Sequence, residues 1–152
     1  MLRGALQDIG SLTEEDRDTM YRIMERHYAN VSREAFDQDL VEKDGVLVLF
    51  DKEQKIQGFS TYLFIRSTYR GDPITSLFSG DTIIEKQYWG SQALFGSFGR
   101  LLYRLMADNP GRKTYWFLIT KGFRTYLMLP LFFKTFFPRC DMETPEYEKG
   151  LI

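Results

Sequence analysis

The sequence has few of the residues that form disulfide bonds or hold metals. Its 152 residues include one cysteine, Cys140, and one histidine, His27. One cysteine cannot form an internal disulfide bond, so nothing indicates an oxidising compartment. A metal site of histidine and cysteine ligands is not expected, because such a site needs several of them. A Ser/His/Asp catalytic set is also not indicated, because no pattern places the one histidine beside a candidate serine.

Long apolar runs and an excess of one charge are also missing. The formal net charge is −1, from 20 Lys and Arg against 21 Asp and Glu, which predicts no general affinity for nucleic acid. Residues 1–10 lack the apolar core of a signal peptide, and we therefore expect a cytoplasmic protein. The apolar run Tyr126–Phe137 is too short to span a bilayer and contains Pro130 and Lys134. We interpret it as a core helix, with an anchor at the membrane surface as the alternative.

The composition that is present is that of a globular protein. Hydrophobic residues make up 43% of the chain and charged residues 27%, within a length that suits one domain. We therefore predict a single domain over residues 1–152.

The stretch Ile74–Met106 organises the rest of the chain. It predicts a strand over Ile74–Ile84, a loop over Glu85–Gly90 and a helix capped by Ser91. Gly80 interrupts the strand pattern and indicates a bulge or a close approach. The helix has one apolar face, made of Leu94, Phe98, Leu101, Leu102 and Leu105. A glycine loop before a helix start suits an anion such as phosphate, although many such loops are only strand-to-helix turns.

The remaining segments complete an alternation of helices and strands. Capping-box spacing at Ser11/Glu14 and again at Thr13/Asp16 predicts a first helix, and Ser32 can cap a second that runs to about Lys43. No clear strand precedes these helices. The other predicted elements are strands over Gly45–Phe50, Ile56–Arg66 and Thr114–Ile119, a turn over Ser67–Pro73, and a helix over Phe123–Phe136. The predicted order is ααβββαβα, an α/β fold with a mixed sheet whose last strand lies parallel to Ile74–Ile84.

This order, over about residues 12–139, resembles the GCN5-related N-acetyltransferase (GNAT) superfamily. The block IIEKQYWGSQALFGSFGRLL stands where that family has a strand, then Tyr-Arg-Gly-x-Gly-x-Gly/Ala, then a helix. Tyr88 and Gly90 match this motif. Trp89 replaces the arginine, Gln92 the second glycine and Leu94 the third small residue.

The resemblance implies a GNAT-like acyl-CoA N-acyltransferase fold and a set of site residues. Acetyl-CoA or another acyl-CoA would lie where two parallel strands separate near a bulge at Ser79-Gly80-Asp81. The implied cofactor-binding residues are Ser79, Gly80, Tyr88, Trp89, Gly90, Ser91 and Lys121. Asp81 and Glu85 are the candidate acceptors of the amine proton. Family members often have a tyrosine acid in the last helix. Phe133 stands near that position and cannot donate a proton, which leaves Tyr126 as the candidate.

The chain departs from the family pattern after its last predicted helix. The usual two closing strands are missing, so the sequence is either a trimmed piece of a longer protein or a minimal version of the fold. The open edge of Thr114–Ile119 would then favour self-association, and a homodimer is one expectation.

Two principal functions remain open. One is transfer of an acyl group from a CoA or carrier-protein thioester to an amine. The other is a non-catalytic GNAT-like domain that binds another ligand or a protein partner. Neither requires a metal or a nucleic acid.

Overall fold

Residues 1–120 and 126–152 are described by the computed structural model of the chain, and they divide into two units, Met1–Leu118 and Ile119–Ile152. The first unit contains the sheet and the helices that cover it. The second contains short helices and connecting segments. Each unit is described by itself, and the predicted single domain over residues 1–152 stays a prediction.

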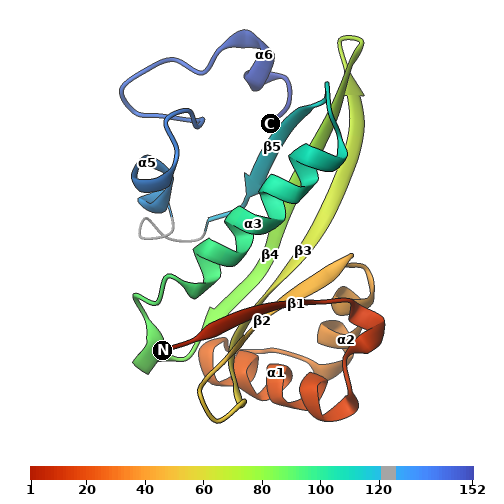
Figure 1. The fold of residues 1–152 in the computed structure, drawn as a ribbon, viewed down its shortest axis with the longest axis vertical. Helices are drawn as coiled ribbons and strands as arrows, with labels where there is room; N and C mark the ends of the chain where they lie inside the picture. The colour runs from red at the N-terminus through yellow and green to blue at the C-terminus, as the bar shows by residue number, and fades with distance from the viewer. Residues whose placement is uncertain (121–125) are drawn as a thin grey trace. The chain divides into compact units, whose positions relative to one another are not determined.

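The first unit is built on a sheet with the strand order β1-β2-β3-β4-β5 among the described residues (Figure 1). The strands are β1 (Arg3–Gln7), β2 (Gly45–Phe50), β3 (Ile56–Tyr69), β4 (Asp72–Ile84) and β5 (Lys113–Leu118). Strands β1 to β4 pair antiparallel, and β5 pairs parallel to β4. The predicted mixed sheet and its parallel last pair are confirmed.

Strand β1 corrects the sequence prediction that no strand precedes the first helix. It pairs along β2 from Arg3↔Phe50 to Gln7↔Val46. Its five residues, RGALQ, include glycine and alanine, which have little intrinsic preference for strands. Pairing with the buried strand β2 therefore decides this element, and no local pattern reveals it.

The hairpin of β3 and β4 is longer than predicted. The sequence pattern predicts a turn over Ser67–Pro73, but the strands pair as far as Tyr69↔Asp72. Arg70 and Gly71 alone form the turn, both with positive φ, at 52° and 86°. A two-residue turn of this kind fits the twist of paired strands and lets them run to its edge.

The first two helices begin at residues with capping side chains. Helix α1 (Glu14–His27) starts after Thr13, whose hydroxyl accepts the Asp16 N–H at 3.1 Å. Thr13 N–H donates to the Asp16 carboxylate at 3.0 Å, which completes a capping box. Helix α2 (Arg33–Val41) is capped by Ser32, as predicted. The Ser11/Glu14 alternative is wrong, because Ser11 lies in a preceding 3-10 turn and donates to Asp8.

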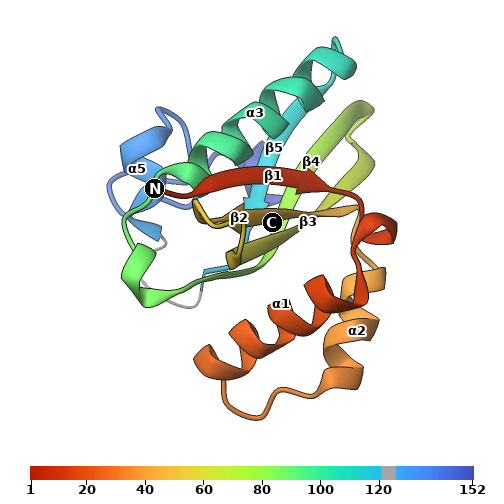
Figure 2. The ribbon, with the colours of Figure 1, turned by 60° about the horizontal axis from the view of Figure 1, so that its bottom comes forward.

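Helix α3 (Ala93–Asp108) carries the predicted apolar face. Leu94, Phe98, Leu101 and Leu105 are buried against the sheet. The predicted cap is wrong by one residue. Gln92 occupies the N-cap position, and the Ser91 hydroxyl accepts the Ala93 N–H at 3.3 Å. Figure 2 shows α3 on one side of the sheet and α1 with α2 on the other.

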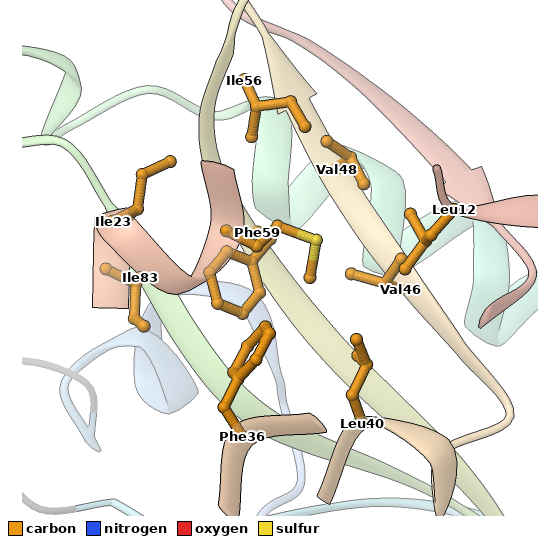
Figure 3. Close-up of a cluster of buried hydrophobic side chains, with 10 residues drawn as sticks. Leu12, Ile23, Phe36, Leu40, Val46, Val48, Ile56, Phe59 and Ile83 are labelled. Carbon is orange, nitrogen blue, oxygen red and sulfur yellow. The ribbon is translucent and has the colours of Figure 1, made fainter. Parts of the chain in front are cut away.

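Two apolar clusters fill the two sides of the sheet. On the α1/α2 side, Figure 3 shows Phe36 of α2 facing Phe59 of β3, and Leu40 of α2 pointing toward Val46 of β2. The α3 side is formed by Leu2, Leu47, Leu49, Tyr62, Leu77, Leu94, Phe98, Leu101 and Leu105. All buried residues of both clusters lie before Leu118, so the first unit has its own core.

The second unit departs from the predicted final helix. Within the part of it that the structure describes, helices are short: α5 (Met128–Phe132) and α6 (Glu146–Lys149). The prediction of one helix over Phe123–Phe136 is wrong beyond Phe132, and residues 123–125 lie outside the described residues. Phe133 is already extended, at φ −123° and ψ 130°. No helix in the described part of the chain has the length and apolar character needed to cross a membrane.

Candidate active site

A bulge in β4 lies where the sequence predicts it, at Ser79-Gly80-Asp81. Tyr62 of β3 pairs with Ser79 and Ser60 pairs with Thr82, so two steps along β3 match three along β4. The extra residue kinks β4 and sets its next residues at a new angle. A Cβ atom at Gly80 would lie 2.4 Å from the Thr61 hydroxyl oxygen, so the bulge has no space for a larger residue.

The parallel pairing of β4 with β5 ends at the same place. The last pair is Ser79↔Leu118, whereas β4 continues to Ile84 and stays paired with β3 through Gly58↔Ile84. Of the described residues, none forms a ladder with Gly80–Ile84 on the side away from β3. Strand β5 ends at Leu118, so its ladder with β4 stops at the bulge, and β4 continues to Ile84 paired with β3.

A side-chain hydrogen bond marks the last pair of the ladder. The Trp116 indole N–H donates to the Ser79 hydroxyl at 3.1 Å. Trp116 also packs on Phe98 of α3, with ring centroids 5.0 Å apart. Ser79, a predicted cofactor-binding residue, is thus tied to β5 immediately before the strands separate.

The loop after β4 contains the other predicted cofactor-binding residues. Tyr88 packs against the α3-side cluster, whereas Trp89 is 58% exposed and its indole N–H donates to the Ile84 carbonyl at 2.9 Å. Gly90 has a φ of +95°, a left-handed conformation that favours glycine. The loop leads directly into α3, whose first N–H groups lack intrahelical acceptors and carry the positive end of the helix dipole.

Glu85, a predicted proton acceptor, is held by two side chains from the end of α1. Arg26 Nε donates to Glu85 Oε1 at 2.9 Å, and His27 Nε2 lies 3.4 Å from Oε2. Burial raises the pKa of Glu85, but the hydrogen bonds and charges of Arg26 and His27 outweigh burial, and the net pKa falls below its ordinary value. The carboxylate therefore stays ionised at neutral pH and serves as a link between α1 and β4.

The other predicted catalytic and binding residues are distributed between the two units. Asp81 is a partly buried residue of the bulge itself. Tyr126 belongs to the second unit, where its hydroxyl donates to the Pro138 carbonyl at 3.0 Å. Lys121 lies outside the described residues. Ser79, Gly80 and Asp81 thus form the bulge, while the roles of Lys121 and Tyr126 stay predictions.

Two polar residues beside the bulge were not found from the sequence. Thr61 is 2% exposed, and its hydroxyl has no hydrogen-bond partner among the described residues. Lys43 places its Cε atom 3.4 Å from where a Cβ of Gly80 would lie. Only the Asp39/Lys43 spacing of four residues hints at an ion pair. Nothing local connects either residue to Gly80.

A cavity of about 420 Å³ lies elsewhere in the first unit. Its lining includes Tyr62, Arg66, Arg104 and Asp108, from β3 and the C-terminal half of α3. None of the described residues that the sequence predicts for the site line it, and those of the first unit lie in β4 and in the loop before α3.

The sequence matches no protein-family model and no curated protein. The fold is similar to that of glucosamine-6-phosphate N-acetyltransferase from Arabidopsis thaliana, with a TM-score of 0.61 and 12% identity over 96% of this chain and 99% of that one. It is similar to an acetyltransferase from Trypanosoma brucei, with a TM-score of 0.60 and 12% identity over 95% and 100% of the two chains. It is also similar to a predicted acetyltransferase with acetyl-CoA from Clostridium acetobutylicum, with a TM-score of 0.61 and 13% identity over 94% of this chain and 96% of that one. The chain therefore has the GNAT fold.

Proposed function

We propose that this protein is an acyltransferase that moves an acyl group from a CoA thioester to an amine. The observation that carries the proposal is the end of the β4–β5 ladder at Ser79↔Leu118, directly beside the bulge at Gly80. Structures of the same fold include one with acetyl-CoA and one with an analogue that joins CoA to an aminoglycoside-type acceptor, which supports a thioester and an amine as the two substrates.

The thioester would lie along Gly80–Ile84, where β4 has no parallel neighbour among the described residues. The phosphates would then reach the loop Tyr88–Ser91 and the start of α3. Backbone N–H groups and the positive end of the helix dipole favour an anion there. Trp89 is exposed beside this path and can cover the pantetheine arm. The protein would act mainly by holding the thioester and amine in place.

Asp81 is our preferred acceptor of the amine proton. It lies in the bulge, next to the proposed position of the thioester carbonyl. Glu85 is a weaker candidate because Arg26 and His27 occupy its carboxylate and the net effect lowers its pKa. A carboxylate with a lowered pKa is a poorer base. Tyr126 remains the proposed proton donor to the leaving thiolate.

Thermal unfolding with acetyl-CoA tests the proposal. At about 100 times Kd, a ligand adds about 2.7 kcal/mol to the free energy of unfolding, which for a domain of this size raises Tm by about 5 to 10 °C. We expect Gly90→Val to abolish this rise, because the new side chain strains a φ of +95° and occupies the phosphate loop.

Gly71→Val is the matched control. Gly71 also has a left-handed φ, +86°, and open space around it, but it lies in the β3–β4 turn. This variant should lose similar stability and keep the rise in Tm. No rise in the unmodified protein at millimolar acetyl-CoA would contradict the proposal.

A non-catalytic binding domain is the second candidate, favoured by Trp89 in place of the motif's arginine. Its indole N–H uses the Ile84 carbonyl, the last main-chain acceptor of β4. This candidate, which binds another ligand or a protein partner, predicts that acetyl-CoA releases no free thiol with any amine in a panel of amino sugars, amino acids and polyamines, and that a pull-down yields a stable complex. Release of free thiol with any one of these amines would reject this candidate and support the acyltransferase.

A further inference from the structure

Lys43 places a buried amine on the α1/α2 side of the sheet. Its side chain is only 9% exposed. Nζ donates to Asp39 Oδ1 at 2.6 Å and to the Asp39 carbonyl at 3.2 Å. An ammonium group is strongly hydrated and is seldom buried without a charged partner. The ion pair with Asp39 explains why the Lys43 side chain can be buried. Hydrogen bonds to Asp39 at the end of α2 do not by themselves require the side chain to extend to β4.

The Lys43 side chain reaches the bulge. Its Cε atom lies 3.4 Å from the position that a Cβ of Gly80 would take. The Thr61 hydroxyl approaches the same position to 2.4 Å, is buried, and has no hydrogen-bond partner among the described residues. An unpaired buried hydroxyl costs stability. The end of the Lys43 carbon chain and the Thr61 hydroxyl therefore both lie beside Gly80, at the point where the ladder of β4 with β5 ends.

We propose that Lys43 is itself an acyl acceptor, so that the protein acylates its own Lys43 from a bound thioester. This inference rests on the proposed function, which places the thioester carbonyl at Gly80. The Asp39 carboxylate takes a proton from the Lys43 ammonium, and the neutral Nζ attacks the carbonyl carbon. The carbon–sulfur bond breaks, Nζ releases its second proton to solvent, and the sulfur leaves as a thiolate that receives the first proton from Asp39 through solvent. The products are an amide on Lys43 and a free thiol.

The Thr61 hydroxyl lies beside the carbon chain of Lys43 at Gly80 and is buried. The amide is uncharged, so the product loses the ion pair between Lys43 and Asp39. The modification would therefore remove the positive charge of Lys43 beside the bulge.

Peptide mass spectrometry of the full chain incubated with acetyl-CoA tests this assignment. Lys52, with a side chain 84% exposed, is the reference amine. An unguided acyl donor reacts with exposed amines first. A thioester held at Gly80 should instead acetylate Lys43 at least about tenfold faster than Lys52, because binding raises the local concentration of the donor.

Two controls separate guided from unguided reaction. Acetic anhydride, which has no CoA moiety to bind, should modify Lys52 before Lys43. Asp39→Asn removes the proton acceptor and should slow acetylation of Lys43 while that of Lys52 is unchanged, with circular dichroism confirming that the variant is folded. Equal or slower reaction at Lys43 than at Lys52 with acetyl-CoA overturns the inference.

The failure of this inference is distinguishable from that of the proposed function. If acetyl-CoA raises Tm and Lys43 stays unmodified, only self-acylation is rejected. If acetyl-CoA leaves Tm unchanged, the thioester site itself is rejected, and self-acylation is rejected with it.

Discussion

At the scale of single residues, the site depends on a contact between Gly80 and Thr61. The bulge brings the main chain of β4 so close to β3 that the Thr61 hydroxyl oxygen lies 2.4 Å from a Cβ built on Gly80. Cβ atoms in proteins do not approach other heavy atoms so closely. The close approach of β4 to β3 therefore requires glycine at this position, directly after the last pair of β4 with β5 at Ser79↔Leu118.

Gly80→Ala should destabilise the protein by about 1 to 3 kcal/mol, the cost of overfilling a packed site. Urea unfolding followed by circular dichroism measures this loss. Thr61→Ala in the same chain removes the obstructing oxygen and should recover at least half of it. Gly99→Ala is the control, because Gly99 lies inside α3 with no atom within 4 Å of its Cβ position. That change should raise stability by up to about 1 kcal/mol. A Gly80→Ala variant as stable as the parent would show that the bulge tolerates a side chain.

At the scale of elements, the start of α1 shows how the structure resolves two overlapping signals. Ser11 and Thr13 both precede an acidic residue by three positions, and the sequence does not choose between them. Only the Thr13 hydroxyl accepts a hydrogen bond from a helical N–H group. The Ser11 hydroxyl instead donates to the Asp8 carbonyl in the turn that follows β1. The helix therefore begins at the second of the two signals.

Thr13→Ala should lower the free energy of unfolding by about 1 kcal/mol, the usual value of an N-cap side chain. Ser11→Ala should change it by less than about 0.5 kcal/mol, as most exposed substitutions do. Chemical denaturation of both variants under the same conditions provides the comparison. A larger loss for Ser11→Ala than for Thr13→Ala would mean that the helix begins at the earlier signal.

At the scale of the whole molecule, both apolar clusters that the described residues form belong to the first unit. Their buried residues all lie before Leu118, and Trp116 of β5 packs against one of them. Within the second unit, Lys149 forms ion pairs with Glu143 and Glu146. Exposed ion pairs of this kind contribute little stability.

A fragment of residues 1–118 should therefore fold alone. We expect a single cooperative urea transition, with a slope of about 1 to 3 kcal/mol per molar as for other small domains. A fragment of residues 1–112 lacks β5 and the contact of Trp116 with Phe98, and it should be markedly less stable. A gradual transition for the 1–118 fragment would show that residues 119–152 complete the core.

The sequence alone determined the elements whose signals are local. The apolar face of α3, the Ser32 cap, the strand Gly45–Phe50 and the glycine bulge were all predicted, because each depends on residues close together in the chain. The resemblance to the GNAT superfamily followed from the order of these elements, and the fold was confirmed.

Only the tertiary structure decided the features that join distant segments. Strand β1 forms because it pairs with the edge of β2. Strands β3 and β4 extend to Tyr69 and Asp72 because each supplies hydrogen-bond partners to the other. The contact of Lys43 and Thr61 with Gly80 has the same origin. The register of β3 with β4 brings Thr61 to Gly80, and Lys43 reaches the same glycine from the segment that follows α2. Register is fixed by the burial of whole strand faces, a property of the folded sheet that no short stretch of sequence contains.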